Sequence, residues 1–290
     1  MRTKKTKKRK KIAVSCIVVL GVVLLVYLGQ CHWVHGKESF VPEYEKVILS
    51  ETTDYETIFL QTGLGRAAVE RLLAEGEFFK VLEAQDNFFA PRQVSCVSLI
   101  GWFTKEDKLE LGQQVRLTSG TVQNSVEYPE FLDLQPGDIL LSISTHSVGW
   151  RHGHVALVLD ENTTVESVMW GTDSTYGSIE GWKDYSNWAV LRVKDVTPEL
   201  QQQVADYGQE VLYGVPYHLS AGFIGSKAPE ADEAGFGVHC SYLAWYAWNH
   251  FGYDLDSDGG RLVTAEDLLH SEKVEIVQVY GMDPREFLEQ

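Results

Sequence analysis

The spacing of hydrophobic and polar positions divides the chain into a helical first part and a mixed second part. In the segment 67–75, Val69, Leu72 and Leu73 share one face at helical spacing, which predicts an amphipathic helix. We expect a further helix within 87–102, so that residues 50–110 form a helical extension. From about residue 111 onward, short apolar runs alternate with turn residues, a pattern typical of strands.

The second part carries signals for strands and then for helices on both sides of residue 240. Thr197 and Pro198 suit the cap and the first position of a helix, which is predicted to run to about Leu212. The segment 241–251 is mostly apolar, which predicts a buried helix. The other predicted elements are strands at 139–143, 154–160, 163–169, 189–193 and 274–279 and a short helix at 265–269. Strands followed by helices indicate the α+β class.

An uncharged segment near the N-terminus predicts a membrane anchor. Residues 12–28 carry no charge and reach about 26 Å as a helix, so slightly more chain completes a span. Residues 1–11 hold eight basic side chains and no acidic one, which favours a cytoplasmic N-terminus and an exported body. The predicted organisation is a basic cytoplasmic tail at 1–11, a transmembrane signal anchor at 12–29, a linker and helical extension at 30–110, and a C-terminal domain at 111–290. A cleaved signal peptide and a lipoprotein signal ending at Cys31 are the alternatives.

The charge of the body argues against nucleic acid as a partner. The chain of 290 residues has a net charge of −16, and without residues 1–11 its 17 basic and 41 acidic side chains give −24. Binding to phosphates needs clustered Lys and Arg. We therefore expect no nucleic-acid function.

The four cysteines indicate neither a disulfide framework nor a zinc ribbon. Cys16 and Cys31 lie in or beside the predicted anchor, which leaves Cys96 and Cys240 for the body, and no C-x-x-C pair occurs. The sequence leaves a disulfide between Cys96 and Cys240 open. Such a bond would remove Cys240 as a nucleophile.

Cys240, His154 and Glu166 are the candidate catalytic residues. A cysteine at the start of a helix has a lowered pKa and a backbone N–H that can join an oxyanion hole. His154 begins a predicted strand and can serve as the base. Glu166 follows 12 residues later, across a turn, so it can orient the imidazole from the neighbouring antiparallel strand. Each residue alone has an ordinary structural interpretation, and only the set indicates a cysteine hydrolase.

The motifs around these residues resemble the NlpC-type papain-fold superfamily, in its permuted YiiX/YebB-like branch. They cover about 130–280 in the order of that family, namely Pro136-Gly137-Asp138-Ile139-Leu140, Gly153-His154-Val155-Ala156, Gly214-Val215-Pro216-Tyr217, Cys240-Ser241-x-Leu243 and the stretch from Gly252 to Leu269. The resemblance implies a circularly permuted papain-like catalytic domain at 111–290. It also implies roles for Cys240 as nucleophile, His154 as base, Glu166 as third polar member and Tyr217 as a hydroxyl near the thiol. Members act on amide or ester bonds, including cell-wall peptides, and some relatives act on lipids.

Two positions depart from the pattern of this branch. The branch usually has Cys-Ser-Glu-Leu, whereas Tyr242 stands at the glutamate position, which puts that residue's contact with substrate in doubt. His239 precedes the cysteine and adds a second imidazole. We interpret His239 as a surface ring, with a perturbation of Cys240 as the alternative.

Other patterns are weaker. Cys96 is a rival nucleophile, but no Pro-Tyr element stands before it, so we favour a packed helix cysteine.

Three histidines lie close together in the sequence, His146, His152 and His154, but they lack an evident fourth ligand for zinc. We therefore expect neither a metal nor a cofactor. The run from Asp254 to Gly259 matches the start of a calcium loop, but Ala265 stands where the bidentate glutamate belongs, which favours an acidic turn. The tryptophans near the histidine motif fit either core packing or the rim of a groove, and they are Trp150, Trp170, Trp182 and Trp188.

The sequence therefore predicts a membrane-anchored cysteine amidohydrolase or peptidase that faces outward, with residues 12–29 in the membrane. Its expected partner is a peptide or lipid acyl substrate, with a cell-wall peptide preferred. The alternative is a lipid amide or ester hydrolase or an acyltransferase. A non-catalytic papain-like module that binds wall or partner proteins is the competing hypothesis.

Overall fold

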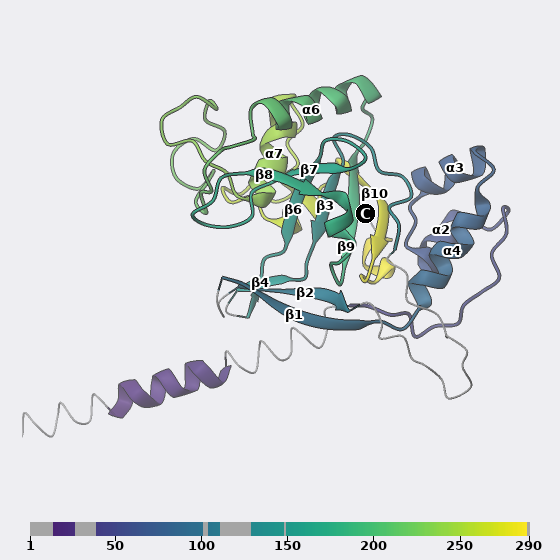
Figure 1. Ribbon diagram of the computed structural model, residues 1–290, viewed down its shortest axis with the longest axis horizontal. Helices are drawn as coiled ribbons and strands as arrows, with labels where there is room; N and C mark the ends of the chain where they lie inside the picture. Colours follow the sequence, from purple (N-terminus) through teal and green to yellow (C-terminus); the bar gives the residue numbers. More distant parts are fainter. Residues whose placement is uncertain (1–13, 27–38, 101–103, 111–128, 148, 289–290) are drawn as a thin grey trace, which may run out of the picture.

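The computed structural model describes residues 14–26, 39–100, 104–110, 129–147 and 149–288 (Figure 1). They form an α+β structure with two antiparallel sheets. The helices of the body are α2 (Tyr55–Thr62), α3 (Arg66–Ala74), α4 (Phe78–Phe89), α5 (Ile179–Trp182), α6 (Pro198–Glu210), α7 (Cys240–His250) and α8 (Ala265–Leu269), with a 3-10 helix at Pro284–Phe287.

The predicted transmembrane anchor at 12–29 is wrong for the structure as described. Residues 14–26 form a helix. Within the described residues, no helix is both long and apolar enough to cross a membrane. The predicted basic tail at 1–11 and Cys31 lie outside the described residues.

A six-stranded antiparallel sheet forms the centre of the body. Its strands are β10 (Val274–Tyr280), β9 (Trp188–Val193), β3 (Ile139–Ser142), β6 (His154–Val158), β7 (Thr163–Glu166) and β8 (Thr175–Ser178), in that order across the sheet. β6 and β7 are joined by a tight connection, and Ala156 pairs with Glu166 across them. This register places the first residue of β6 close to the last residue of β7.

The central strands β3, β6 and β9 are buried on both faces, which agrees with their mostly apolar sequences. Leu141 and Leu157 belong to the core beneath α6, α7 and α8. Leu140 and Val158 belong to a second core, which contains residues of α2, α3, α4 and α5. Successive side chains of a strand point to opposite faces. Figure 1 shows the two sets of helices, with α7 packed against β6 and α3 against β10.

The second sheet shows that the predicted helix at 87–102 is wrong. Helix α4 ends at Phe89, before Pro91, and β1 (Gln93–Ile100) follows, paired with β2 (Thr104–Glu110). Proline disfavours the helical conformation of the residue before it, and Ala90 is extended with ψ 135°. The sheet continues through β4 (Thr145–Ser147) and β5 (Trp150–Arg151). Residues 93–100 and 104–110 are therefore strands, and the helices of the predicted extension lie within 55–89.

The predicted elements around residue 240 are confirmed. Thr197 caps α6 by accepting a hydrogen bond from the backbone N–H of Leu200 at 3.3 Å. Helix α7 begins at Cys240, and its residues from Ser241 to Trp248 are buried. Helix α8 has the predicted bounds of 265–269. These helices pack on the sheet and bring the start of α7 to the start of β6.

A buried ion pair ties the turn before β3 to β9, and its loss is expected to destabilise the fold. Arg192 donates two hydrogen bonds to the fully buried carboxylate of Asp138, at 2.9 and 2.7 Å, and two to Asp133, at 2.8 Å to its carboxylate and 2.7 Å to its backbone carbonyl. Arg192→Met leaves Asp138 without its cation, and we expect a loss of about 3–5 kcal/mol in the free energy of unfolding. Urea denaturation measures it.

The same variant has an expected pH dependence. Burial already raises the pKa of Asp138 to about 6, although Arg192 acts to lower it. Without Arg192 that pKa rises further, so the destabilisation is expected to shrink as the pH falls and Asp138 takes up a proton. Adding Asp138→Asn to Arg192→Met removes the stranded charge and should restore part of the loss. A loss that is equal at pH 5 and pH 8 contradicts this account.

Candidate active site

His154 and Glu166 meet across neighbouring strands of the central sheet. His154 is the first residue of β6, two positions from Ala156, which pairs with Glu166 on β7. Positions two apart share a face of the sheet, so the two side chains are diagonal neighbours. The imidazole Nε2 lies 2.7 Å from Glu166 Oε2, and both side chains are buried. This contact leaves Nδ1 of the ring for another partner.

The Glu166 carboxylate is held by two further hydrogen bonds. Its Oε1 accepts from the Thr164 hydroxyl at 2.7 Å and from the Trp182 indole N–H at 3.0 Å. Burial acts to raise the pKa of Glu166, but the hydrogen bonds and the charge of His154 outweigh it and lower that pKa. Gly177 on β8 is required here, because a Cβ at this position would overlap the carboxylate. The carboxylate is thus ionised and fixed toward His154.

The His154 ring is held in place by aromatic side chains. Trp182 stacks on it with ring centroids 5.3 Å apart and planes 12° from parallel, and Tyr185 lies 6.3 Å away. Burial acts to lower the pKa of His154, but hydrogen bonds with Cys240 and Glu166 raise it to about 10. The direction of this shift favours the protonated imidazolium form of the ring.

Cys240, in the first turn of α7, is the third member of the set formed with His154 and Glu166. Burial acts to raise the pKa of its thiol, but hydrogen bonds with His154 and His239 and the charge of His154 lower it well below the usual value. The positive end of the α7 dipole favours the thiolate in the same way. Because Glu166 occupies Nε2 of His154, Nδ1 is the nitrogen left for the sulfur. The directions of the two pKa shifts favour a thiolate–imidazolium pair, with the Glu166 carboxylate behind it.

Tyr217 approaches the thiol from a separate loop. The loop is held by the backbone N–H of Tyr217, which donates to Thr172 at 3.0 Å, and by a bridge between Tyr217 and Val238. Burial and the charge of Cys240 raise the pKa of the Tyr217 phenol to about 12. Its hydroxyl therefore keeps its proton at neutral pH, and its nearness to Cys240 is seen only in this effect of charge.

His239 is not a surface ring, so that interpretation is wrong. It is the N-cap residue of α7 and is only 6% exposed. Tyr242 is also buried, and its hydroxyl donates to the carbonyl of Lys227 at 2.8 Å. Tyr242 thus anchors the loop between Tyr217 and Cys240.

Other sequence candidates lie elsewhere. Cys96 is an exposed residue of strand β1, so the expected packed helix cysteine is wrong, and no disulfide joins Cys96 to Cys240. His146 is on β4, while His152 contacts Ser147 at 2.8 Å, away from the contact of His154 with Glu166. Of the tryptophans, Trp182 and Trp188 are buried and Trp150 and Trp170 are exposed.

Sequence reasoning did not single out Thr164, Trp182, Tyr185 or Gly177 as parts of the site. The alternation along β7 offered one signal for Thr164, because it lies two positions from Glu166 and so shares its face.

The acidic run after α7 does bring carboxylates together. Asp256, Asp258 and Asp267 have oxygens within 4.8 Å of one another. Each already has a partner within the protein. Asp256 pairs with Lys227, Asp258 accepts from the N–H of Gly260 at 2.6 Å, and Asp267 forms the capping box of α8 with Thr264. These contacts agree with an acidic turn.

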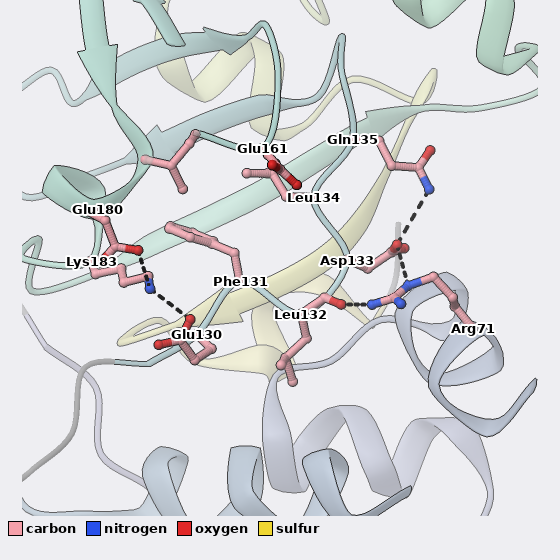
Figure 2. A pocket seen from close by; sticks show the side chains of 11 residues that line it. Arg71, Glu130, Phe131, Leu132, Asp133, Leu134, Gln135, Glu161, Glu180 and Lys183 are labelled. Carbon is pink, nitrogen blue, oxygen red and sulfur yellow. Dashed lines mark hydrogen bonds and ion pairs between the residues drawn. The ribbon is translucent and has the colours of Figure 1, made fainter. Parts of the chain in front are cut away.

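A pocket of about 380 Å³ lies apart from these residues, between α3, α5 and the segment 130–135 (Figure 2). Neither Cys240 nor His154 lines it. Lys183 pairs with Glu130 and Glu180, each at 2.7 Å, and Arg71 pairs with Asp133 at 2.8 Å. The cations that line the pocket are thus neutralised within it.

Comparison with known proteins gives little beyond this geometry. No family model matches the chain, and no curated protein matches it. The chain is similar to the crystal structure of metalloprotein yiiX from Escherichia coli O157:H7, with 16% identity over 49% of this chain and 96% of that chain and a TM-score of 0.36. A likeness this weak carries no argument for function. The YiiX-like resemblance is supported at that coarse level only, and the permuted papain fold stays a prediction.

Proposed function

We propose that the protein is a cysteine hydrolase that cleaves amide or ester bonds, of the permuted papain-like kind. The observation that carries this proposal is the chain of contacts from Cys240 through His154 to Glu166, in which the pKa of the thiol is lowered and that of the imidazole is raised. Burial alone raises the pKa of a thiol and keeps it protonated. A lowered pKa at a buried cysteine therefore supports a chemical role.

In the proposed reaction the Cys240 thiolate attacks the acyl carbon and forms a C–S bond. The carbonyl oxygen becomes an oxyanion beside the first backbone N–H groups of α7, which favour negative charge. His154 then gives its proton to the leaving amine or alcohol as the scissile bond breaks. Water, deprotonated by His154, attacks the thioester, releases the acid and restores the thiolate.

The class of acyl substrate follows from two different observations. The family resemblance of the motifs favours cell-wall peptides. A lipid acyl group is the second candidate, because the loop after Tyr217 exposes Leu219, Phe223 and Ile224, at 72%, 57% and 76%. Isolated peptidoglycan fragments and fatty acyl esters therefore form the two arms of a substrate screen. A mass increase on Cys240 equal to the acyl group identifies the covalent intermediate.

Alkylation of Cys240 tests the nucleophile without a known substrate. We expect iodoacetamide to label Cys240 in the full chain at pH 6 within about tenfold of its rate at pH 9, whereas an ordinary thiol with a pKa near 8.5 loses about tenfold per unit below that pKa. Peptide mass spectrometry resolves each cysteine. His154→Ala should return Cys240 to ordinary behaviour. An ordinary pH profile in the unmodified chain would refute the proposed function.

A further inference from the structure

Tyr185 links the aromatic side chains around His154 to the second sheet. The centroid of its ring lies 4.8 Å from that of Trp182 and 6.3 Å from that of the His154 imidazole. From the second sheet, Nζ of Lys108 lies over the Tyr185 ring, 3.5 Å from its centroid. The face of an aromatic ring attracts a cation at this distance. Tyr185 is therefore in contact with the rings of the site on one hand and with a charged residue of β2 on the other.

The backbone of β2 holds this contact in register. Lys108 forms an antiparallel bridge with Tyr185. One residue further along each segment, the backbone N–H of Leu109 donates to the carbonyl of Asp184 at 2.6 Å. These contacts join β2 to the segment that follows α5. The position of the Tyr185 ring thus depends on the second sheet as well as on packing against its aromatic neighbours.

Lys108 brings a partly buried ion pair to this position. Its ammonium group lies 3.2 Å from the carboxylate of Glu106, and the two side chains are only 22% and 8% exposed. Burial and the carboxylate of Glu106 raise the pKa of Tyr185 well above its usual value. The charges of Glu166 and Cys240 act on that pKa in the same direction, which agrees with a ring close to the site. Desolvation of an ion pair is costly, and apolar side chains of similar volume often fill such a place equally well, so the charged pair points to a role beyond packing.

We propose that Lys108 is a positioning residue for the reaction, which acts on His154 through the ring of Tyr185. This inference rests on the proposed function. Lys108 holds the Tyr185 ring from the side of the second sheet. Tyr185 and Trp182 in turn confine the imidazole, which keeps Nδ1 toward the sulfur of Cys240. No bond forms or breaks at Lys108, and its effect is on the time that the imidazolium spends against the thiolate.

The pH dependence of Cys240 alkylation by iodoacetamide in the full chain measures this effect. Lys108→Met removes the cation and keeps an unbranched side chain, whereas Lys108→Arg keeps a cation that can lie over the Tyr185 ring. Lys105→Met is the matched control. It removes one positive charge from the same strand, three positions away and therefore on the opposite face of the sheet. Circular dichroism and thermal melting establish that each variant is folded.

We expect Lys108→Met to raise the apparent pKa of Cys240 by about half a unit, which corresponds to about threefold less thiolate at pH values below that pKa. Lys108→Arg and Lys105→Met should leave it at the value of the unmodified chain. An unchanged pKa in Lys108→Met, or an equal rise in Lys105→Met, overturns the inference and leaves the proposed function standing. An ordinary thiol in the unmodified chain removes the proposed function itself.

Tyr185→Leu tests whether the effect passes through the ring. Loss of the ring should raise the apparent pKa of Cys240 at least as much as Lys108→Met does. Adding Lys108→Met to Tyr185→Leu should then produce no further rise, because residues that act through a shared partner are not additive. Additive rises would contradict the route through Tyr185. If Lys108→Met does not fold, Lys108→Gln replaces it in the same comparison, since its amide can still donate a hydrogen bond to Glu106.

Discussion

Cys240→Ser is expected to lower the turnover of a cleavable acyl substrate by about 10⁴-fold or more, with the fold unchanged. The substitution exchanges sulfur for oxygen and keeps the side chain on α7. His154 has a pKa raised to about 10 by its contacts with Cys240 and Glu166, which suits an ion pair with a thiolate. A serine hydroxyl remains protonated beside such a ring, so the nucleophile is lost. Hydrolysis of the substrate selected by the screen, with circular dichroism for the fold, measures both effects.

Cys96→Ser is the matched control. Cys96 is an exposed thiol on β1, and the same exchange of sulfur for oxygen there should leave turnover within about twofold of the unmodified rate, because exposed substitutions away from a site have small effects. Loss of activity in Cys96→Ser and not in Cys240→Ser would move the nucleophile to the second sheet. That outcome rejects the proposed roles of His154 and Glu166.

The contact between His154 and Glu166 could be predicted from the sequence because it is local. The two residues lie 12 positions apart, on strands joined by the turn at Glu161 and Asn162. A tight turn fixes the register of a hairpin, and the register fixes which side chains are diagonal neighbours. The contact of Cys240 with His154 joins positions 86 apart in the sequence. No local pattern predicts it, and the resemblance of the motifs supplied it.

The errors in the prediction concern residues whose structure depends on contacts with distant parts of the chain. His239 looked like a surface ring because a lone histidine before an apolar helix has no periodic signal, and only the packed helix end shows that it is the cap. The segments 93–100 and 104–110 became strands because β1 and β2 pair with each other and β2 pairs with β4, 39 to 43 positions further along the chain. Tertiary pairing of this kind overrides the local preference of a short segment.

The N-terminal anchor was predicted from the apolar composition of 12–29. Within the part of the chain that the structure describes, no helix is both long and apolar enough to cross a membrane.

Glu166→Gln is expected to lower kcat/KM by about 10²–10⁴-fold, because it reverses the hydrogen bond that orients His154. The amide oxygen of glutamine can still accept from Thr164 and Trp182, which occupy Oε1 in the native protein. The amide N–H₂ then faces Nε2 of His154, so that nitrogen must become an acceptor. The imidazole also loses the negative charge that helps to raise its pKa.

The pH profile distinguishes this effect from a loss of structure. The thiolate–imidazolium pair exists only between the apparent pKa values of Cys240 and His154, which belong to the pair as a whole. Without the charge of Glu166, the pKa of His154 falls and that of Cys240 rises. The alkaline limit of activity should therefore move to lower pH and the acid limit to higher pH. A partly unfolded variant loses activity at every pH alike.

Glu161→Gln provides the matched control for Glu166→Gln. Glu161 is exposed in the turn between β6 and β7, five positions before Glu166. Removing its charge should leave the acid and alkaline limits of activity unchanged. The range of activity should narrow in Glu166→Gln alone, because that carboxylate lies 2.7 Å from the imidazole. If both variants retain the native range, Glu166 does not set the charge of His154, and the role of the carboxylate reduces to packing against Thr164 and Trp182.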